Sequence, residues 1–430
     1  MITAITNARL LDPATGTDTA GGLLIEDGRI ADWGAHLATA PSGAEEIIDA
    51  GGHCLAPGLI DLRVKTGEPG EEQRETLASA ARAAVAGGVT TMVVMPDTRP
   101  VIDDVALIQF LTRTDPEQVP VNILAAGALT VGLAGKAMAE IGLMQRAGAA
   151  YFTNGDQPVG DAGILKRAMA YAASQGAIIA SRPDDVSLRG TGVMNAGTFA
   201  DRIGLKGIAR EAEWVGAARD LMLSEATGCR LILDQVSTAR TLELLGDARA
   251  RGVPASAMVA AHHLFFNELD VGDYLTYCKV NPPFRSEEDR QALIAALANG
   301  QIDAVVSAHD PQPPEAKRLP FAEAEFGAAG LETTLSAVLS LVHEGQVELL
   351  AALRALTSGP ADLIGLDAGR LSSGQPADLV LFDAGAPWKC EREALRSRST
   401  NSPFDGRLLQ GRVLRTWFHG RQVFRRDGHA

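Results

Sequence analysis

Metal and nucleophile chemistry depends on histidine, cysteine and carboxylate side chains at set spacings, and this chain has few such sets. Its eight histidines never occur as HxH, HxxH or HExxH, the spacings at which one strand or helix presents two imidazoles to one ion. Its four cysteines form no CxxC pair, so burial in a reducing compartment explains them better than a zinc knuckle. We therefore expect no metal site built from local spacing.

The composition excludes several functional classes. The chain has 430 residues, of which 46% are hydrophobic and 21% charged, as in ordinary globular proteins with a large core. A net charge of −14 argues against a nucleic-acid surface. No uncharged apolar run approaches the roughly 20 residues of a membrane helix, and the first residues lack the basic stretch of a signal peptide. We expect a cytoplasmic protein that binds neither nucleic acid nor membrane.

Both ends of the chain are typical of short strands and turns. Apolar or alternating runs occur at Ile2–Ala8, Gly22–Ile25 and Arg29–Asp32, and again at Leu379–Phe382 and Leu414–Phe424. We expect residues 1–56 and 367–430 to form one small β-sandwich domain, with the middle of the chain inserted between them.

The middle of the chain, residues 57–366, alternates strand-like and helix-like segments, which is typical of βα units around a parallel sheet. Its length suits an α/β fold of the (β/α)8 TIM-barrel type, with the active site where the strands end. The strand candidates are Thr90–Met95, Val121–Ala125, Ala177–Ala180, Arg230–Leu233 and Ala304–Ser307. The helix candidates are Glu75–Ala86, Lys136–Ala147, Gly163–Gln175, Glu211–Thr227, Thr238–Arg251 and Asp289–Ala298. Residues 391–401, rich in Arg and Ser, are expected to form a solvated loop.

A series of short motifs resembles those of dihydroorotases in the amidohydrolase superfamily. Pro57-Gly58-Leu59-Ile60-Asp61 resembles the segment that opens the family's barrel. Further similar segments follow in order along almost the whole chain: Glu68-Pro69-Gly70, residues 94–101, residues 279–285, Pro320-Phe321, residues 326–333 and residues 401–404. The resemblance implies a distorted TIM barrel that holds zinc ions and interconverts carbamoyl aspartate and dihydroorotate.

The family's metal ligands and catalytic acid are absent at the matching positions. The HxH pair matches Arg63 and Lys65, and the bridging carboxylate matches Gly155. Another histidine matches Arg182, the second histidine of the HxxH motif matches Gln235, and the catalytic aspartate matches Ala308. A slip of one residue would bring Asp156, Asp234 or Asp310 into neighbouring roles, but no slip restores an imidazole. The resemblance therefore implies no catalytic residue, no bound metal and no cofactor in this chain.

The substrate contacts implied by the resemblance are only partly retained. Gly67 stands where the family has the arginine that holds the substrate carboxylate, Asp97 replaces an asparagine, and Gln312 replaces a histidine. Asn281, Phe326 and Gly327 match the family's residues. We interpret these six positions as a vestigial pocket.

Three cations replace metal ligands at strand ends. Arginine cannot deprotonate to become a ligand, and fixed positive charge repels a metal ion. We expect Arg63, Lys65 and Arg182 to converge in the barrel mouth and to pair with Asp61, Asp97 or Asp184. Lys65 as a catalytic base or carboxylated lysine, and the two arginines as anion ligands, are the alternatives. His262 and His309 are expected to be packing histidines with satisfied nitrogens.

Three functions remain open from the sequence. The chain resembles the inactive dihydroorotase homologues that associate with aspartate transcarbamoylase, which implies an assembly subunit of that enzyme in pyrimidine biosynthesis and a homo-oligomer. The alternatives are an active dihydroorotase or related cyclic amidase with an atypical site, and an anion-binding module that uses the cationic barrel mouth.

Overall fold

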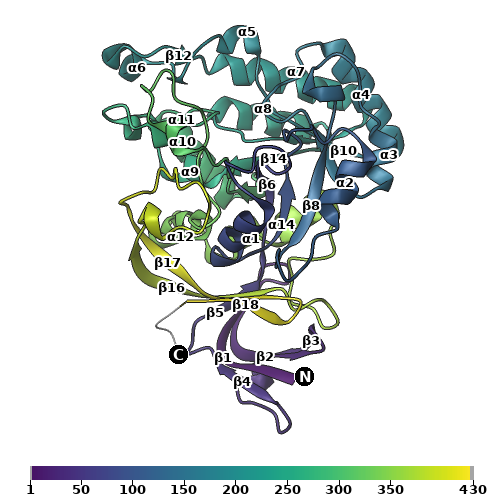
Figure 1. Cartoon of the computed structure of the whole chain (residues 1–430), viewed down its shortest axis with the longest axis vertical. Helices are drawn as coiled ribbons and strands as arrows, with labels where there is room; N and C mark the ends of the chain where they lie inside the picture. Colours follow the sequence, from purple (N-terminus) through teal and green to yellow (C-terminus); the bar gives the residue numbers. More distant parts are fainter. Residues whose placement is uncertain (1, 427–430) are drawn as a thin grey trace.

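The computed structural model describes residues 2–426 and consists of a barrel joined to a separate sheet (Figure 1). Eight parallel strands follow one another around the barrel in chain order, which confirms the TIM-barrel expectation. They are β6 (Leu59–Val64), β7 (Val89–Val94), β8 (Asn122–Ala128), β9 (Ala149–Thr153), β10 (Ile178–Ser181), β13 (Arg230–Leu233), β14 (Ala255–Ala260) and β15 (Ala304–Val306).

The barrel closes where its first and last strands meet. The backbone N–H of Lys65 donates to the carbonyl oxygen of His309 at 2.8 Å, and Val64 and His309 form a parallel bridge. The buried carboxylate of Asp61 adds a side-chain link, because its Oδ2 accepts the backbone N–H of Ser307 at 3.1 Å. The seam therefore brings the ends of β6 and β15 together, at the edge where the site lies.

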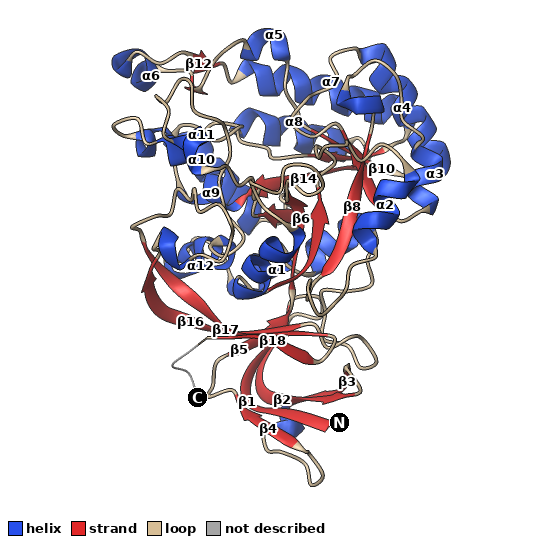
Figure 2. Cartoon of the chain, viewed as in Figure 1, coloured by secondary structure: helices blue, strands red, loops and turns tan. Residues whose placement is uncertain are grey.

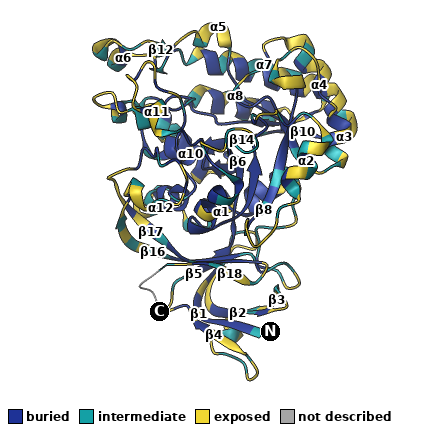
Figure 3. Cartoon of the chain, viewed as in Figure 1, coloured by how far each residue is buried: buried dark blue, intermediate teal, exposed yellow. Residues whose placement is uncertain are grey.

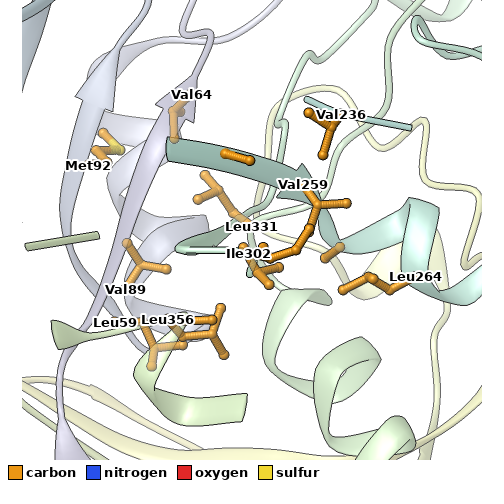
Figure 4. Packing of buried hydrophobic residues seen from close by; sticks show 14 of the residues in the cluster. Leu59, Val64, Val89, Met92, Val236, Val259, Leu264, Ile302, Leu331 and Leu356 are labelled. Atoms are coloured by element: carbon orange, nitrogen blue, oxygen red, sulfur yellow. The ribbon is translucent and has the colours of Figure 1, made fainter. Parts of the chain in front are cut away.

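Side chains of the barrel strands alternate between two cores. Residues of one parity fill the barrel interior, and all eight strands contribute: Ile60, Leu62, Val93, Ala126, Tyr151, Ile178, Ala180, Ile232, Met258, Ala260, Ala304 and Val306. Residues of the other parity pack outward against the helices, and Figure 4 shows Leu59 and Leu356 side by side in that outer cluster. Figure 3 shows the buried strands enclosed by helices whose outer faces are exposed.

The helices surround the barrel (Figure 2). They are α1 (Leu77–Ala86), α2 (Val105–Thr112), α3 (Ile141–Arg146), α4 (Ala162–Gln175), α5 (Val186–Arg189), α6 (Thr198–Ile203), α7 (Glu211–Thr227), α8 (Ala239–Ala250), α9 (Ala261–Phe265), α10 (Glu287–Ala298), α11 (Pro314–Lys317), α12 (Thr334–His343), α13 (Leu349–Arg354) and α14 (Ser358–Ile364). A short parallel pair, β11 (Met194–Asn195) and β12 (Gly207–Ile208), lies outside the barrel.

Most predicted segments match an element, and the differences have local causes. The predicted helix Lys136–Ala147 begins only at Ile141, because the chain bends at residues 135–137 and Met138 forms a bridge with Thr130. The strands β6, β9 and β14 were not among the strand candidates, although the motif at residues 57–61 marks the start of β6. The strands β9 and β14 are short and rich in alanine, so their sequences resemble the helices beside them.

The two chain ends join in one sheet beside the barrel, which confirms the expected small β-domain, although its strands form a single hydrogen-bonded sheet. The strands are β1 (Ile2–Asp12), β2 (Thr17–Glu26), β3 (Arg29–Gly34), β4 (Glu46–Asp49), β5 (Cys54–Pro57), β16 (Leu379–Lys389), β17 (Leu408–Phe418) and β18 (Arg421–Arg425). The ends meet where β5 pairs antiparallel with β16, with Leu55 opposite Leu381. Within residues 2–426, no helix combines the length and apolar character that a membrane span needs.

Residues 391–405 form a strap that runs from the sheet back to the barrel mouth, and the prediction of a solvated loop is wrong for its second half. Ser397, Ser399 and Asn401 are buried. The Asn401 side chain accepts the backbone N–H of Gln312 at 3.0 Å and donates to the carbonyl of Gly327 at 3.0 Å. The serine hydroxyls and asparagine amide that suggested solvent exposure instead satisfy buried groups.

We predict that Asn401→Ala lowers the free energy of unfolding by about 2 kcal/mol, because it leaves a buried N–H and a buried carbonyl without partners. Urea unfolding is the measurement. Glu393→Ala, in the exposed part of the same strap, is the control and should change stability by less than about 0.5 kcal/mol. Equal stability of the two variants would show that the strap does not hold the mouth.

Candidate functional site

One carboxylate, Asp156, holds three cations at the barrel mouth. Its Oδ1 accepts hydrogen bonds from Arg63 Nη2 at 2.6 Å and from Arg182 Nη1 at 2.5 Å. Its Oδ2 accepts a short hydrogen bond from Lys65 Nζ. The three cations therefore converge as the sequence predicts, around an acid that lies just beyond β9.

Three further carboxylates, Asp97, Asp234 and Asp310, extend this ion-pair network. Lys65 Nζ lies 2.9 Å from Asp97 Oδ2 and 3.1 Å from Asp310 Oδ2, so three acids surround the ammonium group. Arg63 Nε donates to Asp234 Oδ2 at 2.8 Å, and both side chains are 2% exposed. Three cations face four aspartates, so the positive charge of the mouth is balanced internally.

An irregularity in β6 directs Arg63 into this network. Asp61 pairs with Met92 and Val64 with Val94, so β6 has one residue more than β7 across that interval. Such a bulge turns side chains away from strict alternation. Arg63 can therefore reach Asp156 and Asp234 from a strand whose Ile60 and Leu62 fill the barrel interior.

Two of the three predicted acid partners are wrong. The Asp61 carboxylate accepts the backbone N–H groups of Arg63 and Ser307, and this bonding commits it to the barrel seam. Asp184 pairs with Arg189 of α5 at 2.7 Å, because the chain beyond Arg182 turns toward the helices. Only Asp97 is a predicted partner that joins the network.

Electrostatics fix the charge state of the network. Burial alone would raise the pKa of Asp156, but the charges of Lys65, Arg63 and Arg182 outweigh it and hold that pKa well below the ordinary value. Burial alone would lower the pKa of Lys65, but Asp156, Asp310 and Asp97 outweigh it and raise that pKa. A general base needs a pKa near the working pH. A lysine held protonated cannot act as a base, and it cannot be carboxylated.

The remaining degenerate positions surround the same mouth. Gly155 adopts a positive φ of 59° next to Asp97. Gln235 and Ala308 also have positive φ, 58° and 50°, which is uncommon for residues other than glycine. Gln235 Oε1 accepts a hydrogen bond from Arg182 Nη1 at 3.2 Å. The mouth thus has strained backbone at Gln235 and Ala308.

A cavity of about 500 Å³ opens above the ion-pair network. Of the six vestigial pocket positions, four line it: Asn281, Gln312, Phe326 and Gly327. Gly67 and Asp97 instead line a small hollow next to the main cavity. Lys65 and Asp310 line both spaces. The structure therefore brings only part of the expected pocket together.

The sequence predicts packing histidines with satisfied nitrogens, but neither histidine of the mouth has both nitrogens satisfied. The His309 Nδ1 accepts the backbone N–H of Gly330 at 3.2 Å, and its buried Nε2 lies 3.4 Å from Glu75 but has no hydrogen-bond partner among the described residues. The buried Nε2 of His262 also has no hydrogen-bond partner there. Burial, with smaller effects of His263 and Arg63, lowers the pKa of His262 well below the ordinary value, so its imidazole is neutral.

The sequence analysis named the acids that matter most, Asp156, Asp234 and Asp310, only as residues that a one-residue slip would bring into neighbouring roles, and it did not predict that they pair with the cations. Each lies within a few residues of the end of a barrel strand, β9, β13 or β15. Because the carboxyl ends of barrel strands meet at one face, this position was a usable signal. It was overlooked because the family motif places the bridging acid one residue earlier, at Gly155.

Comparison with known proteins gives consistent matches. A family model described as Dihydro-orotase-like matches residues 52–241, and one described as Amidohydrolase family matches residues 341–424. A protein named Dihydroorotase from Syntrophotalea carbinolica is 41% identical over 421 residues, which cover 98% of both chains. One of the same name from Pelobacter propionicus is 38% identical over 422 residues, covering 98% of this chain and 99% of that protein.

Solved structures agree on the fold. L-Hydantoinase (dihydropyrimidinase) from Arthrobacter aurescens superposes with a TM-score of 0.88 at 26% identity, covering 98% of this chain and 96% of that one. D-Hydantoinase (dihydropyrimidinase) from Thermus sp. superposes with a TM-score of 0.83 at 21% identity, covering 98% and 95% of the two chains.

The residues of the mouth do not fit the zinc ions that the sequence resemblance implies. Zinc sites use neutral imidazoles, thiolates and carboxylates. Among residues 2–426, no group of three or more such side chains is arranged to hold a metal ion. Both carboxylate oxygens of Asp156 are occupied by cationic hydrogen-bond donors.

We predict that Arg63→Ala lowers the free energy of unfolding by about 3–5 kcal/mol, because it leaves Asp234 as a buried charge without its partner. Thermal unfolding is the measurement. The exposed Arg421→Ala is the control and should leave the melting temperature almost unchanged. An unchanged melting temperature for Arg63→Ala would mean that the arginine is solvated.

We also predict a pH-dependent cost for Asp156→Asn. A folded-state pKa below the unfolded value gives stability that is present above the unfolded pKa and is lost as the pH falls toward the folded one. The stability difference from the unsubstituted protein should therefore be large at neutral pH and shrink below about pH 4, near the aspartate pKa of an unfolded chain. Urea unfolding across pH measures it.

The exposed Asp273→Asn is the matched control and should show no such trend. A constant stability difference between Asp156→Asn and the unsubstituted protein, from neutral pH to about pH 3, would contradict a depressed pKa at Asp156.

Proposed function

The chain belongs to the dihydroorotase family of amidohydrolases, and on that premise we propose that it is a catalytically inactive member that serves as a cytoplasmic assembly subunit for aspartate transcarbamoylase. The observation that carries the first half of the proposal is the bonding of Asp156 to Arg63, Lys65 and Arg182. This network occupies the strand ends at which the resemblance of this chain to the family predicts metal ligands.

Hydrolysis of a cyclic amide needs a polarised carbonyl, an activated water and a group that shuttles a proton. Asp156 is a weak base because its pKa is held low, and Lys65 is held protonated. Ala308 stands where the family has its catalytic aspartate and has no group that transfers a proton. These properties of Asp156, Lys65 and Ala308 support the proposal of an inactive site.

The scaffold argument supports the second half of the proposal. Hydrogen bonds hold the strap and the barrel seam, and ion pairs hold the buried charges of the mouth. This framework is intact, although the side chains at the mouth differ from those that the resemblance implies. A protein–protein role requires such a fold without requiring a catalytic residue. A stable interface of about 1,200–2,000 Å² needs a rigid surface of this kind. The partner is taken from the resemblance to inactive dihydroorotase homologues.

An active dihydroorotase is the second candidate, because relatives of that name are 37–41% identical along nearly the whole chain. An anion-binding module is less favoured. Arg63, Lys65 and Arg182 are each paired with internal carboxylates, so a bound anion would have to displace an existing partner.

The test combines three measurements on the full chain purified without chelators. We expect well under one zinc per chain, no turnover of dihydroorotate, and co-purification of aspartate transcarbamoylase from the source cell. That enzyme should be smaller and less active or less stable when the chain is removed.

Two outcomes would contradict the proposal. Turnover of dihydroorotate above about 1 s⁻¹, in the range of ordinary enzymes, would refute inactivity. The same size, activity and stability of aspartate transcarbamoylase with and without the chain would refute the assembly role for that partner. The two halves of the proposal therefore fail separately.

A further inference from the structure

Arginines gather in the last part of the described chain. Residues 391–426, which comprise the strap, β17 and β18, contain nine arginines and three acidic residues, although the whole chain has a net charge of −14. Arg392 and Arg407 of this segment pair with Glu393 and Asp270. The arginines outnumber the acids of the segment, so it forms a basic region on an acidic protein.

Three of these arginines converge beside Phe424 of β18. The guanidinium carbons of Arg396 and Arg426 lie 5.1 Å and 5.2 Å from the centre of the Phe424 ring, so they are no more than about 10 Å apart. Arg426 Nε donates to the carbonyl oxygen of Val413 at 2.8 Å, which places this guanidinium next to Arg412 of β17. The strap, β17 and the end of β18 therefore bring three positive charges to one place.

These three positive charges have no carboxylate partner among the described residues. Glu332 is the acid beside them, but it accepts the backbone N–H of Arg396 at 2.5 Å. Burial, and then the charges of Arg412 and Arg396, lower the pKa of Arg426 to about 10, although Glu332 acts in the opposite direction. At Arg412 only the Nε atom is buried, and its terminal nitrogens, like those of Arg426, reach solvent. The three groups therefore repel one another and present unbonded donors at the surface.

Phosphate is the anion that fits this arrangement. A guanidinium group donates two parallel N–H bonds to the oxygens of a phosphate group, a geometry that a point charge cannot reproduce. A phosphate group carries about two negative charges and three acceptor oxygens, whereas a carboxylate has one charge and two oxygens. Three guanidinium groups can therefore share one phosphate, and its binding offsets their repulsion.

We propose that Arg396, Arg412 and Arg426 form a binding site for a phosphate group, carried by free phosphate, by diphosphate or by a small phosphate ester. None of the three residues lines the cavity of the barrel mouth. The site lies instead where β17 packs against α12, at the junction of the barrel and the sheet (Figure 1). The proposal does not depend on the assembly role, because it rests only on side chains of this chain.

The test is calorimetry on the full chain in a phosphate-free buffer at constant ionic strength. The probes are inorganic phosphate, pyrophosphate and glucose 6-phosphate, which represent the three sources, and acetate is the control anion. We expect saturable binding of at least one phosphate probe, about tenfold tighter than that of acetate or more, because paired charge-assisted hydrogen bonds are strong. The same probe should raise the melting temperature of the chain.

The variants remove one guanidinium group at a time. Arg396→Gln and Arg412→Gln should each weaken binding of the preferred probe about tenfold, because each removes a charge and a pair of donors. Arg396→Lys should recover only part of the affinity, because lysine keeps the charge without the planar fork. The matched control is Arg421→Gln, in an exposed arginine of the same basic region, and it should leave binding unchanged.

Three results would overturn the proposal. They are no saturable binding of any phosphate probe, binding of acetate as tight as that of the phosphates, and binding that neither Arg396→Gln nor Arg412→Gln weakens. The last result would place the anion elsewhere on the chain. If Arg412→Gln unfolds, Arg396→Gln decides, because the Arg396 side chain is exposed and forms no hydrogen bond with the described residues.

Discussion

The Asp156 carboxylate joins three strands of the barrel through side chains alone. It accepts hydrogen bonds from Arg63 and Lys65 at the end of β6 and from Arg182 just beyond β10, while Asp156 itself follows β9. A carboxylate at this point without its cations would be an uncompensated charge in a partly buried position. The side chain is 28% exposed, so water contributes, but the cations dominate its charge state.

The other acids of the mouth pair with the cations that Asp156 brings together. Three cations brought to one carboxylate need further partners, and Asp234, Asp97 and Asp310 supply them. The arrangement links strand ends, which is a structural role that a multivalent metal ion also performs by binding ligands from several strands. In this chain, ion pairs between side chains connect the strand ends at the mouth.

The strap extends the same support to the far side of the mouth. Asn401 bonds the backbone of Gln312 and Gly327, and both of those residues line the cavity. Gly327 has φ of 127°, and a Cβ there would meet the Asp310 carbonyl oxygen at 2.5 Å, so this loop packs tightly against the segment that follows β15. The cavity wall is therefore positioned by the chain's C-terminal part, which belongs to the other sheet.

The sequence by itself determined the element order and the barrel, because local periodicity and residue type carry that information. The expectation that metal ligands are missing came from the resemblance to the family's motifs. The helix Glu211–Thr227 and the strand Arg230–Leu233 were predicted with the bounds that the structure has. Only the tertiary structure decided which acids pair with which cations. The direction of a side chain at a strand end depends on a bulge in β6 and on turns beyond the strands, which bring residues up to about 250 positions apart into contact, as in the pair of Lys65 and Asp310. The burial of the strap could not be predicted from the sequence either. Serine and asparagine side chains usually indicate solvent exposure, and only the structure shows the buried groups to which they hydrogen-bond.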